Sequence, residues 1–209
     1  CSNHLLGEFP YLMLDAHFEK VRKNGSVRDC AILTAVGINT KGRREVIGVS
    51  VSLSEAEPHW RAFLKSLKNR GLSGVKYAVS DDHDGLKNAL KAEMTPVIWQ
   101  RCQCHLQRNA FSYVPKVSMR SPVAEDLRDV FNAKDRPSAE KRLEECVEKY
   151  RSTAPRLAQW MQDNIPDGLN VFALPKNHRK RMRTTNTLER LHEELKRRTR
   201  IARLFPNEE

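Results

Sequence analysis

The sequence has no long hydrophobic run. Its longest nearly apolar stretch, residues 31–38, is interrupted by Thr34 and is far shorter than the ~20 residues that a membrane-spanning helix needs. No signal peptide is predicted, because residues 3–4 and 7–8 interrupt the first apolar positions. The chain opens with Cys1 rather than methionine, so we expect a fragment or a processed protein. These features exclude a membrane protein and a small secreted protein.

Cysteine is also scarce. The five cysteines are an odd number scattered through 209 residues, a length that buries a core without disulfides. A hydrophobic content of 39% with 30% charged residues is typical of a globular protein and excludes disorder along the whole chain. We therefore expect reduced thiols and a cytoplasmic location.

Acidic residues are outnumbered by basic ones. The chain has 37 Lys and Arg against 26 Asp and Glu, a net charge of +11. Residues 176–203 hold eleven Lys and Arg but only three acidic residues, a local net charge of +8. A phosphate backbone would bind such a segment by counterion release, whereas the alternative is a basic surface kept for solubility. Nucleic acid is the expected partner.

Three segments near the N-terminus have strand character. They span residues 10–15, 27–38 and 45–53 and are rich in β-branched and apolar residues. Turn signals separate them at Asn24-Gly25 and at residues 41–43. The pattern predicts an antiparallel meander.

The hydrophobic period then changes. A helix is predicted from Ser54 to about Gly71, a strand over 75–80, a second helix over 85–94 and a strand over 97–100. A strand–helix–strand unit of this length requires a crossover, so the fourth and fifth strands should be parallel. The fold class expected is α/β, with a mixed five-stranded sheet and helices on its faces.

The remainder has helical periodicity only. Residues 121–164 read as a helical insertion, residues 176–183 as a basic loop, and residues 186–200 as a final helix. The chain has no internal repeat and no low-complexity segment.

Two aspartates stand at informative positions. Asp15 lies in a strand-like pattern, where an ionised aspartate is unusual, and Asp81 follows the fourth predicted strand. A divalent metal ion is one reason for such placement, because Mg²⁺ prefers carboxylate oxygens. The alternative for Asp81 is a polar loop that caps the next helix.

Glu189 is the third candidate carboxylate. The final helix is predicted to bury Leu188, Leu191 and Leu195, and Glu189 lies off that stripe. Its spacing from Asn186 also fits a capping box, which would make it structural. Glu193, one turn further on, has an alternative as an ion-pair partner of Arg197. Spacing alone does not decide between these interpretations.

Ordered motifs along nearly the whole chain resemble those of a known family. The sequence is similar to the Mutator-like transposases of bacterial insertion sequences, with consistent spacing throughout. The motifs are Tyr11-Leu-Met-Leu-Asp15-Ala, Arg44-Glu-Val-Ile-Gly48-Val, Trp60-Arg-Ala-Phe-Leu64, Val79-Ser-Asp81, Gln100-Arg-Cys102-Gln-Cys-His105-Leu-Gln-Arg-Asn109, Thr185-Asn186, Glu189-Arg190, Arg197-Arg-Thr-Arg200 and Phe205-Pro-Asn207.

The resemblance implies a ribonuclease H-like fold with an Asp, Asp, Glu catalytic triad. The triad falls on Asp15, Asp81 and Glu189, which would bind two Mg²⁺ ions, with Mn²⁺ able to substitute. Asp82 follows Asp81 directly, so either residue could be the second ligand. The long gap before Glu189 would hold the helical insertion.

The family's Cys-x-x-His pair falls on Cys102 and His105, as auxiliary residues of the active site. A zinc site that includes Cys104 is the alternative, but no second ligand pair occurs at usable spacing.

The implied domains are residues 1–115 as the first part of the core, residues 116–175 as the helical insertion, and residues 176–209 as a basic loop and closing catalytic helix. The N-terminal DNA-binding and C-terminal regions of the family are expected to be absent. The residues expected to contact DNA phosphates are Arg179, Lys180, Arg181, Arg183, Arg190, Arg197, Arg198 and Arg200.

The implied function is a DNA transposase core that hydrolyses phosphodiesters at transposon ends and transfers strands into target DNA. Double-stranded DNA is the implied partner, with a homodimer or larger assembly on it, in the bacterial cytoplasm near the nucleoid. One alternative is a catalytically inactive DNA-binding remnant. The other is a ribonuclease H-type nuclease without strand transfer.

Overall fold

The computed structural model describes residues 5–23 and 26–199. Five strands form one sheet in the order β3-β2-β1-β4-β5. Their bounds are Tyr11–Lys23 for β1, Ser26–Ile38 for β2, Arg44–Ser52 for β3, Tyr77–Ser80 for β4 and Ile98–Arg101 for β5. The α/β fold class predicted from the sequence, a mixed five-stranded sheet flanked by helices, is confirmed.

Strand pairing explains why the sheet is mixed. β1 pairs antiparallel with β2 along thirteen residues of each strand, and β2 pairs antiparallel with β3. β1 pairs parallel with β4 on its other edge. The turn predicted at Asn24-Gly25 lies outside the described residues. β1 is longer than predicted, because the sequence after Asp15 is polar and only the pairing with β2 shows that it stays extended.

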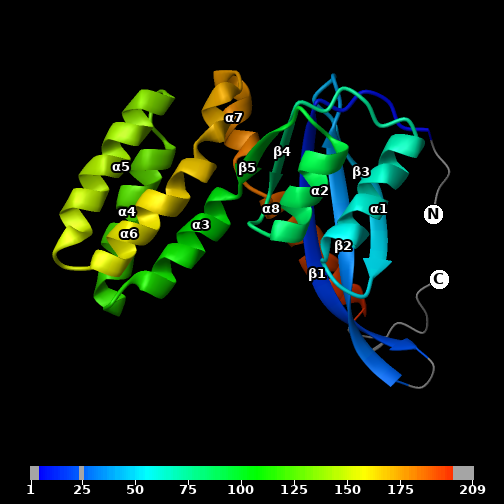
Figure 1. Ribbon diagram of the computed structural model, residues 1–209, viewed down its shortest axis with the longest axis horizontal. Helices are drawn as coiled ribbons and strands as arrows, with labels where there is room; N and C mark the ends of the chain where they lie inside the picture. The colour runs from blue at the N-terminus through cyan, green and yellow to red at the C-terminus, as the bar shows by residue number, and fades with distance from the viewer. Residues whose placement is uncertain (1–4, 24–25, 200–209) are drawn as a thin grey trace. The chain divides into compact units, whose positions relative to one another are not determined.

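One face of the sheet carries the core of this unit. Side chains alternate along β1, so Leu12 and Leu14 point to the face covered by α1 (Glu57–Asn69) and α2 (Asp84–Glu93) (Figure 1). α1 contributes a buried stripe of Trp60, Phe63, Leu64 and Leu67. A Cβ at Gly48 of β3 would lie 2.7 Å from Leu67 Cδ2, so glycine permits this close approach of helix and sheet.

The remaining helices belong to a second compact unit, Gln100–Thr184, while residues 1–99 and 185–209 form the first unit. Its helices are α3 (Gln103–Ala110), α4 (Arg120–Phe131), α5 (Arg136–Arg151), α6 (Pro155–Asn164) and α7 (Lys176–Met182), with short 3₁₀ segments at Phe111–Tyr113, Val117–Met119, Ile165–Gly168 and Asn170–Ala173. This helical unit has its own core, which includes Leu106, Leu127, Leu157 and Met161.

The helical unit extends beyond the predicted insertion at both ends. On the N-terminal side, α3 joins it because Gln103 Nε2 donates to the carbonyl of Gly168 at 2.8 Å. On the C-terminal side, residues predicted as a basic loop form α7, and that prediction is wrong. The sequence did not predict this helix, because Met182 is its one buried residue and a single apolar position makes no helical period.

The chain then returns to the sheet as α8 (Asn186–Thr199). In the first unit, α8 lies on the face of the sheet opposite α1 and α2 (Figure 1). Neither residues 5–23 nor residues 26–199 contain a helix with the length and apolar composition needed to cross a membrane.

Candidate active site

The two predicted aspartates lie close to the paired ends of neighbouring strands. In the parallel pairing, Met13 of β1 is opposite Val79 of β4. Asp15 lies two residues after Met13 within β1, and Asp81 lies two residues after Val79, directly after β4 ends at Ser80. Side chains two residues apart along a strand point to the same face, so Asp15 shares the face that carries Met13, and Asp81 follows β4 at the level of Asp15. Asp15 is 8% exposed and Asp81 is half-buried. The strand that holds Asp15 and the strand that precedes Asp81 are therefore direct neighbours in the sheet.

Asp82 has a different environment. The Lys87 ammonium of α2 forms an ion pair with the carboxylate of Asp82 and another, at 2.9 Å, with that of Asp84. Because α2 covers the opposite face of the sheet, this pairing draws Asp82 away from the side of Asp15. The register therefore favours Asp81 over Asp82 as the neighbour of Asp15.

Glu189 lies in the first turn of α8, which is packed along β1. The helix begins where the carbonyl of Thr185 accepts from the backbone amides of Leu188 and Glu189, at 2.8 and 3.1 Å. Glu189 is half-buried, whereas Glu193 is exposed. Of these two acidic residues, Glu189 is the one that packing holds in place.

The buried face of α8 differs from the prediction. Leu188 is fully buried, but Leu195 is 37% exposed and does not belong to the buried stripe. His192 takes the inward position instead, with 5% of its surface exposed. The reason is that Asp15 and Thr34 of the sheet face α8 at this position and offer polar atoms to the His192 ring.

His192 contacts two strands at once. Its Nδ1 lies 3.3 Å from Asp15 Oδ2 on β1, and its Nε2 lies 3.1 Å from Thr34 Oγ1 on β2. The ring of His17, two residues after Asp15, is tilted against that of His192 with 4.0 Å between centroids. Burial, with the nearby His192 and Lys196, lowers the pKa of His17 to about 4, so its ring is neutral near pH 7. Sequence reasoning missed both histidines, since nothing in the spacing of residues 17 and 192 relates them.

Glu55 is a further carboxylate at this end of the sheet. Burial raises the pKa of its carboxyl, His83 lowers it, and the negative charges of Asp15 and Asp81 raise it again. His83 Nε2 lies 4.0 Å from Glu55 Oε2. No sequence signal predicts this placement, because Ser54-Glu55 has the composition of a helix start.

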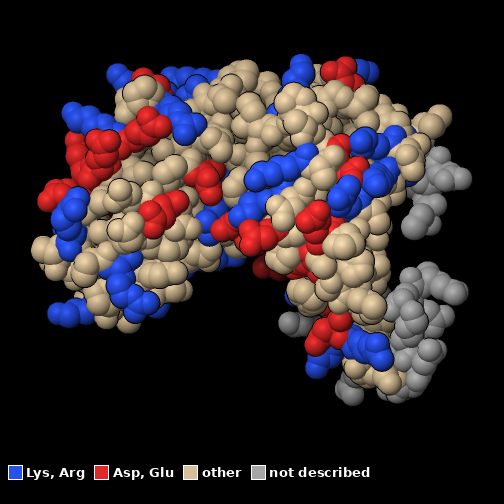
Figure 2. All heavy atoms as spheres, in the orientation of Figure 1, with Lys and Arg blue, Asp and Glu red and all other residues tan. Residues whose placement is uncertain are grey.

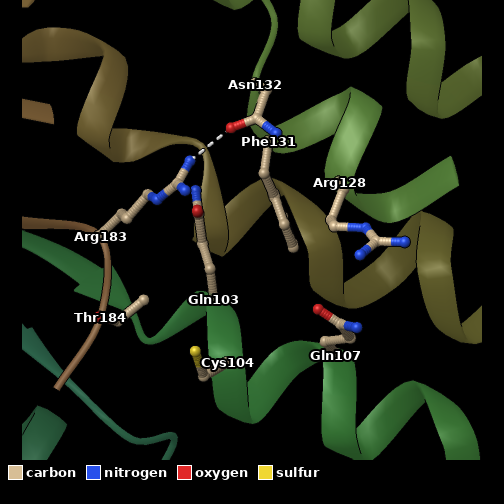
Figure 3. A pocket seen from close by; sticks show the side chains of 8 residues that line it. All are labelled: Gln103, Cys104, Gln107, Arg128, Phe131, Asn132, Arg183 and Thr184. Atoms are coloured by element: carbon tan, nitrogen blue, oxygen red, sulfur yellow. Dashed lines mark hydrogen bonds between the residues drawn. The ribbon is translucent and has the colours of Figure 1, made fainter. Parts of the chain in front are cut away.

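Cys102 and His105 belong to the helical unit. Cys102 is fully buried immediately before α3, and His105 is half-buried within it. Cys104 lines a small cavity of about 80 Å³ together with Gln103, Gln107, Arg128, Phe131, Asn132, Arg183 and Thr184 (Figure 3). The described cysteines, at positions 30, 102, 104 and 146, form no disulfide.

The basic residues of α7 are of two kinds. Arg179 points inward and donates to three backbone carbonyls, those of Leu174, Lys134 and Phe172, at 2.9 to 3.1 Å. Its guanidinium also lies 5.2 Å from the centre of the Phe172 ring. Lys180 and Arg181, by contrast, are exposed. Arg179 therefore ties α7 to the rest of the helical unit, whereas its neighbours face solvent.

A larger cavity of about 340 Å³ lies beside α7 within the helical unit. Arg183 is half-buried and lines both this cavity and the small one, and it donates to Asn132 Oδ1 at 2.7 Å, a bond drawn in the view of the small cavity (Figure 3). Five cationic residues and, in this described region, no acidic one line the cavity: Lys134, Lys176, Arg179, Lys180 and Arg183. On the face drawn in Figure 2, cationic and acidic side chains are otherwise interspersed over each unit.

The cationic end of α8 is partly neutralised. Arg197 and Arg198 both donate to the carboxylate of Glu194 at 2.8 Å, and these bonds lower the pKa of Glu194 to about 2. Arg190 is exposed on the same helix. Arg200 lies outside the described residues, as do Phe205-Pro-Asn207.

Comparison with known proteins decides the family. The family profile described as Transposase, Mutator family, matches residues 2–209. The chain belongs to the Mutator family of transposases. The resemblance seen in the sequence motifs is confirmed.

Three relatives show how close the match is. The chain is 51% identical over 202 residues to the transposase for insertion sequence element IS406 of Burkholderia multivorans, covering 97% of this chain and 52% of that protein. It is 41% identical over 201 residues to the transposase for ISRM5 of Rhizobium meliloti, covering 96% and 50%. It is 35% identical over 211 residues to the transposase for IS256 in transposon Tn4001 of Staphylococcus aureus, covering 99% and 54%. The chain spans about half the length of these relatives.

Proposed function

We propose that this chain is the catalytic core of a DNA transposase, which hydrolyses a phosphodiester at each transposon end and joins the freed 3′-hydroxyl to target DNA. The observation that carries the proposal is the pairing of β1 with β4, which brings Asp15 and Asp81 to the same level of the sheet, together with the packing of α8, the helix of Glu189, on β1. On this basis, three carboxylates far apart in the sequence would lie on one side of one sheet.

The residues at this end of the sheet fit a divalent metal ion. Burial raises the pKa of the Glu55 carboxyl, His83 lowers it, and the charges of Asp15 and Asp81 raise it further, which supports a concentration of negative charge there. A cation would relieve that repulsion, and carboxylate oxygens are the ligands that Mg²⁺ prefers. Asp15, Asp81 and Glu189 would hold two Mg²⁺ ions. When bound, these ions would act as Lewis acids and stabilise the charge that develops on the phosphodiester oxygens.

The protein itself supplies position and charge in this scheme. Asp15 is fixed by burial and by His192, and Glu189 is carried on the same helix as that histidine. No covalent intermediate with the protein is required, because water or a 3′-hydroxyl is the nucleophile. Cys102 and His105 are proposed as auxiliary residues that position the DNA.

We expect the protein to bind DNA through its phosphates rather than through its bases. Lys180, Arg181 and Arg190 are exposed and suited to this contact, and Arg183 faces the cationic cavity of the helical unit. Arg197, Arg198 and Arg200 complete the proposed set. The proposed partner is double-stranded DNA in the bacterial cytoplasm, bound by two or more copies of the protein.

Two other functions predict different results in one experiment. A full-length protein that contains this chain is incubated with Mg²⁺ and DNA that carries its own element ends. A transposase releases 3′-hydroxyl ends and joins them to a target duplex. A ribonuclease H-type nuclease cuts without joining, and an inactive remnant binds DNA without cutting. Absence of metal-dependent cleavage and joining by an intact, DNA-bound protein would contradict the proposal.

The two kinds of basic residue in α7 lead to a prediction about DNA binding. Lys180→Ala should reduce the slope of log K against log salt concentration by about 0.9, the value for one phosphate contact, without lowering the melting temperature. DNA affinity is measured by fluorescence anisotropy across a salt series. An unchanged slope would remove Lys180 from the interface.

Arg179→Ala should behave in the opposite way. Its three bonds to carbonyls stabilise the helical unit, so we expect the free energy of unfolding to fall by about 1–3 kcal/mol. The salt dependence of DNA binding should stay as in the wild type. Denaturant unfolding measures the first quantity. A variant that is fully stable but has a reduced salt slope would assign Arg179 to phosphate contact instead.

A further inference from the structure

The buried ring of His192 contacts two residues that are paired across neighbouring strands of the sheet. Asp15 of β1 and Thr34 of β2 are opposite each other in the antiparallel register. One ring nitrogen of His192 faces each of them, at 3.3 Å from Asp15 Oδ2 and 3.1 Å from Thr34 Oγ1. The ring of His17 packs against the same imidazole. A single side chain of α8 therefore spans β1 and β2.

The chemistry of the two partners fixes which nitrogen matters. A carboxylate only accepts hydrogen bonds, so the contact with Asp15 requires a hydrogen on Nδ1. The Thr34 hydroxyl either donates or accepts, so it tolerates both the neutral and the protonated ring. The contact that places Asp15 thus needs the same donor whatever the charge of the imidazole.

We propose that His192 is a positioning residue, whose Nδ1–H holds the Oδ2 oxygen of Asp15 in the orientation that a divalent cation requires. The inference rests on the proposed function of Asp15 as a metal ligand. Glu189 is three residues before His192 on α8, so the same contact joins Asp15 to the helix that carries the third carboxylate. Groups that orient a ligating carboxylate typically alter metal affinity 10- to 100-fold when they are removed.

Packing alone does not account for the residue. α8 already buries Leu188, and a leucine in place of His192 would fill the same volume without the desolvation of two ring nitrogens. An imidazole is favoured here only because both nitrogens find polar atoms of the sheet. A residue that served packing alone would not need the nitrogen at the δ position.

Two substitutions separate the nitrogens. The amide nitrogen of asparagine occupies about the position of Nδ1, and that of glutamine occupies about the position of Nε2. Binding of Mn²⁺ alone to the full chain is titrated by electron paramagnetic resonance. We expect His192→Asn to keep the affinity within about threefold of the wild type, and His192→Gln to weaken it about 10- to 100-fold.

Two further variants serve as controls. Thr34→Val removes the partner of Nε2 at nearly constant shape and should lower the melting temperature without altering Mn²⁺ affinity. Asp15→Asn should abolish the Mn²⁺ binding in question. Melting temperatures are measured in EDTA, so that loss of folding is separated from loss of the ion.

The outcomes separate this inference from the proposed function. If Asp15→Asn leaves Mn²⁺ binding unchanged, the proposed metal site falls and this inference with it. If Asp15→Asn loses binding while His192→Gln matches the wild type, only the role of His192 is overturned. Equal weakening in His192→Asn and His192→Gln, in step with equal losses of melting temperature, would make His192 a packing residue and also overturn the inference.

Discussion

Glu189→Gln is expected to abolish metal-dependent cleavage and strand transfer in a full-length protein that contains this chain. A metal ligand needs the negative charge that glutamine lacks, because Mg²⁺ prefers carboxylate oxygens and the site must offset its charge. We expect a loss of at least about 1,000-fold in rate, equivalent to about 4 kcal/mol in the activation barrier. Release of 3′-hydroxyl ends from labelled transposon-end DNA is the measurement.

The same substitution should leave the melting temperature and DNA affinity almost unchanged. If Glu189 were only the acceptor of a capping box, glutamine would serve nearly as well and activity would persist. Glu193→Gln, at the exposed position one turn further on, is the matched control and should retain most activity. An active Glu189→Gln beside an inactive Glu193→Gln would move the third ligand by one turn. Full activity in both would contradict the carboxylate mechanism on this helix.

Asp81→Asn should be as severe as Glu189→Gln, whereas Asp82→Asn should retain most activity. The two aspartates are adjacent in sequence, so they form a pair matched in residue type and in position on the same loop. Asp81 follows β4 at the level of Asp15, while Asp82 is paired with Lys87 of α2. We expect a loss of at least about 1,000-fold for Asp81→Asn, measured in the same cleavage assay.

Stability provides a second readout for this pair. Asp82→Asn removes one of the two carboxylates that pair with Lys87. Because this ion pair is accessible to solvent, we expect the free energy of unfolding to fall by no more than about 1 kcal/mol. Mn²⁺ affinity should fall in Asp81→Asn alone. Loss of Mn²⁺ binding in Asp82→Asn with normal binding in Asp81→Asn would assign the second ligand to Asp82.

Much of the fold follows from local sequence. The β-branched segments and their turns predict β2 and β3, and the apolar period of residues 57–69 predicts α1. These signals are local because alternation and helical period are properties of neighbouring residues. The motifs that hold Asp15, Asp81 and Glu189 also predict the family, which the family profile confirms.

The tertiary structure decided the features that lack a local signal. α7 could not be predicted because a single buried residue, Met182, makes no period. Arg179 and Lys180 look equivalent in the sequence, yet only Arg179 meets backbone carbonyls, since the chain at Lys134 and Phe172 comes back to it. The choice between Asp81 and Asp82 similarly depends on which face of the sheet α2 covers.

The surroundings of the proposed active site are the clearest case. The sequence alone predicted three carboxylates, through its resemblance to the family, and determined a basic C-terminal segment, because motifs and charge are local properties of the chain. It did not determine that His192 replaces Leu195 on the buried face of α8, nor that Glu55 shares the field of Asp15 and Asp81. The helical period predicts which residues of α8 share a face. It does not predict what that face packs against, because those contacts join residues more than a hundred positions apart. In α8, the inward-facing His192 contacts the polar side chains of Asp15 and Thr34.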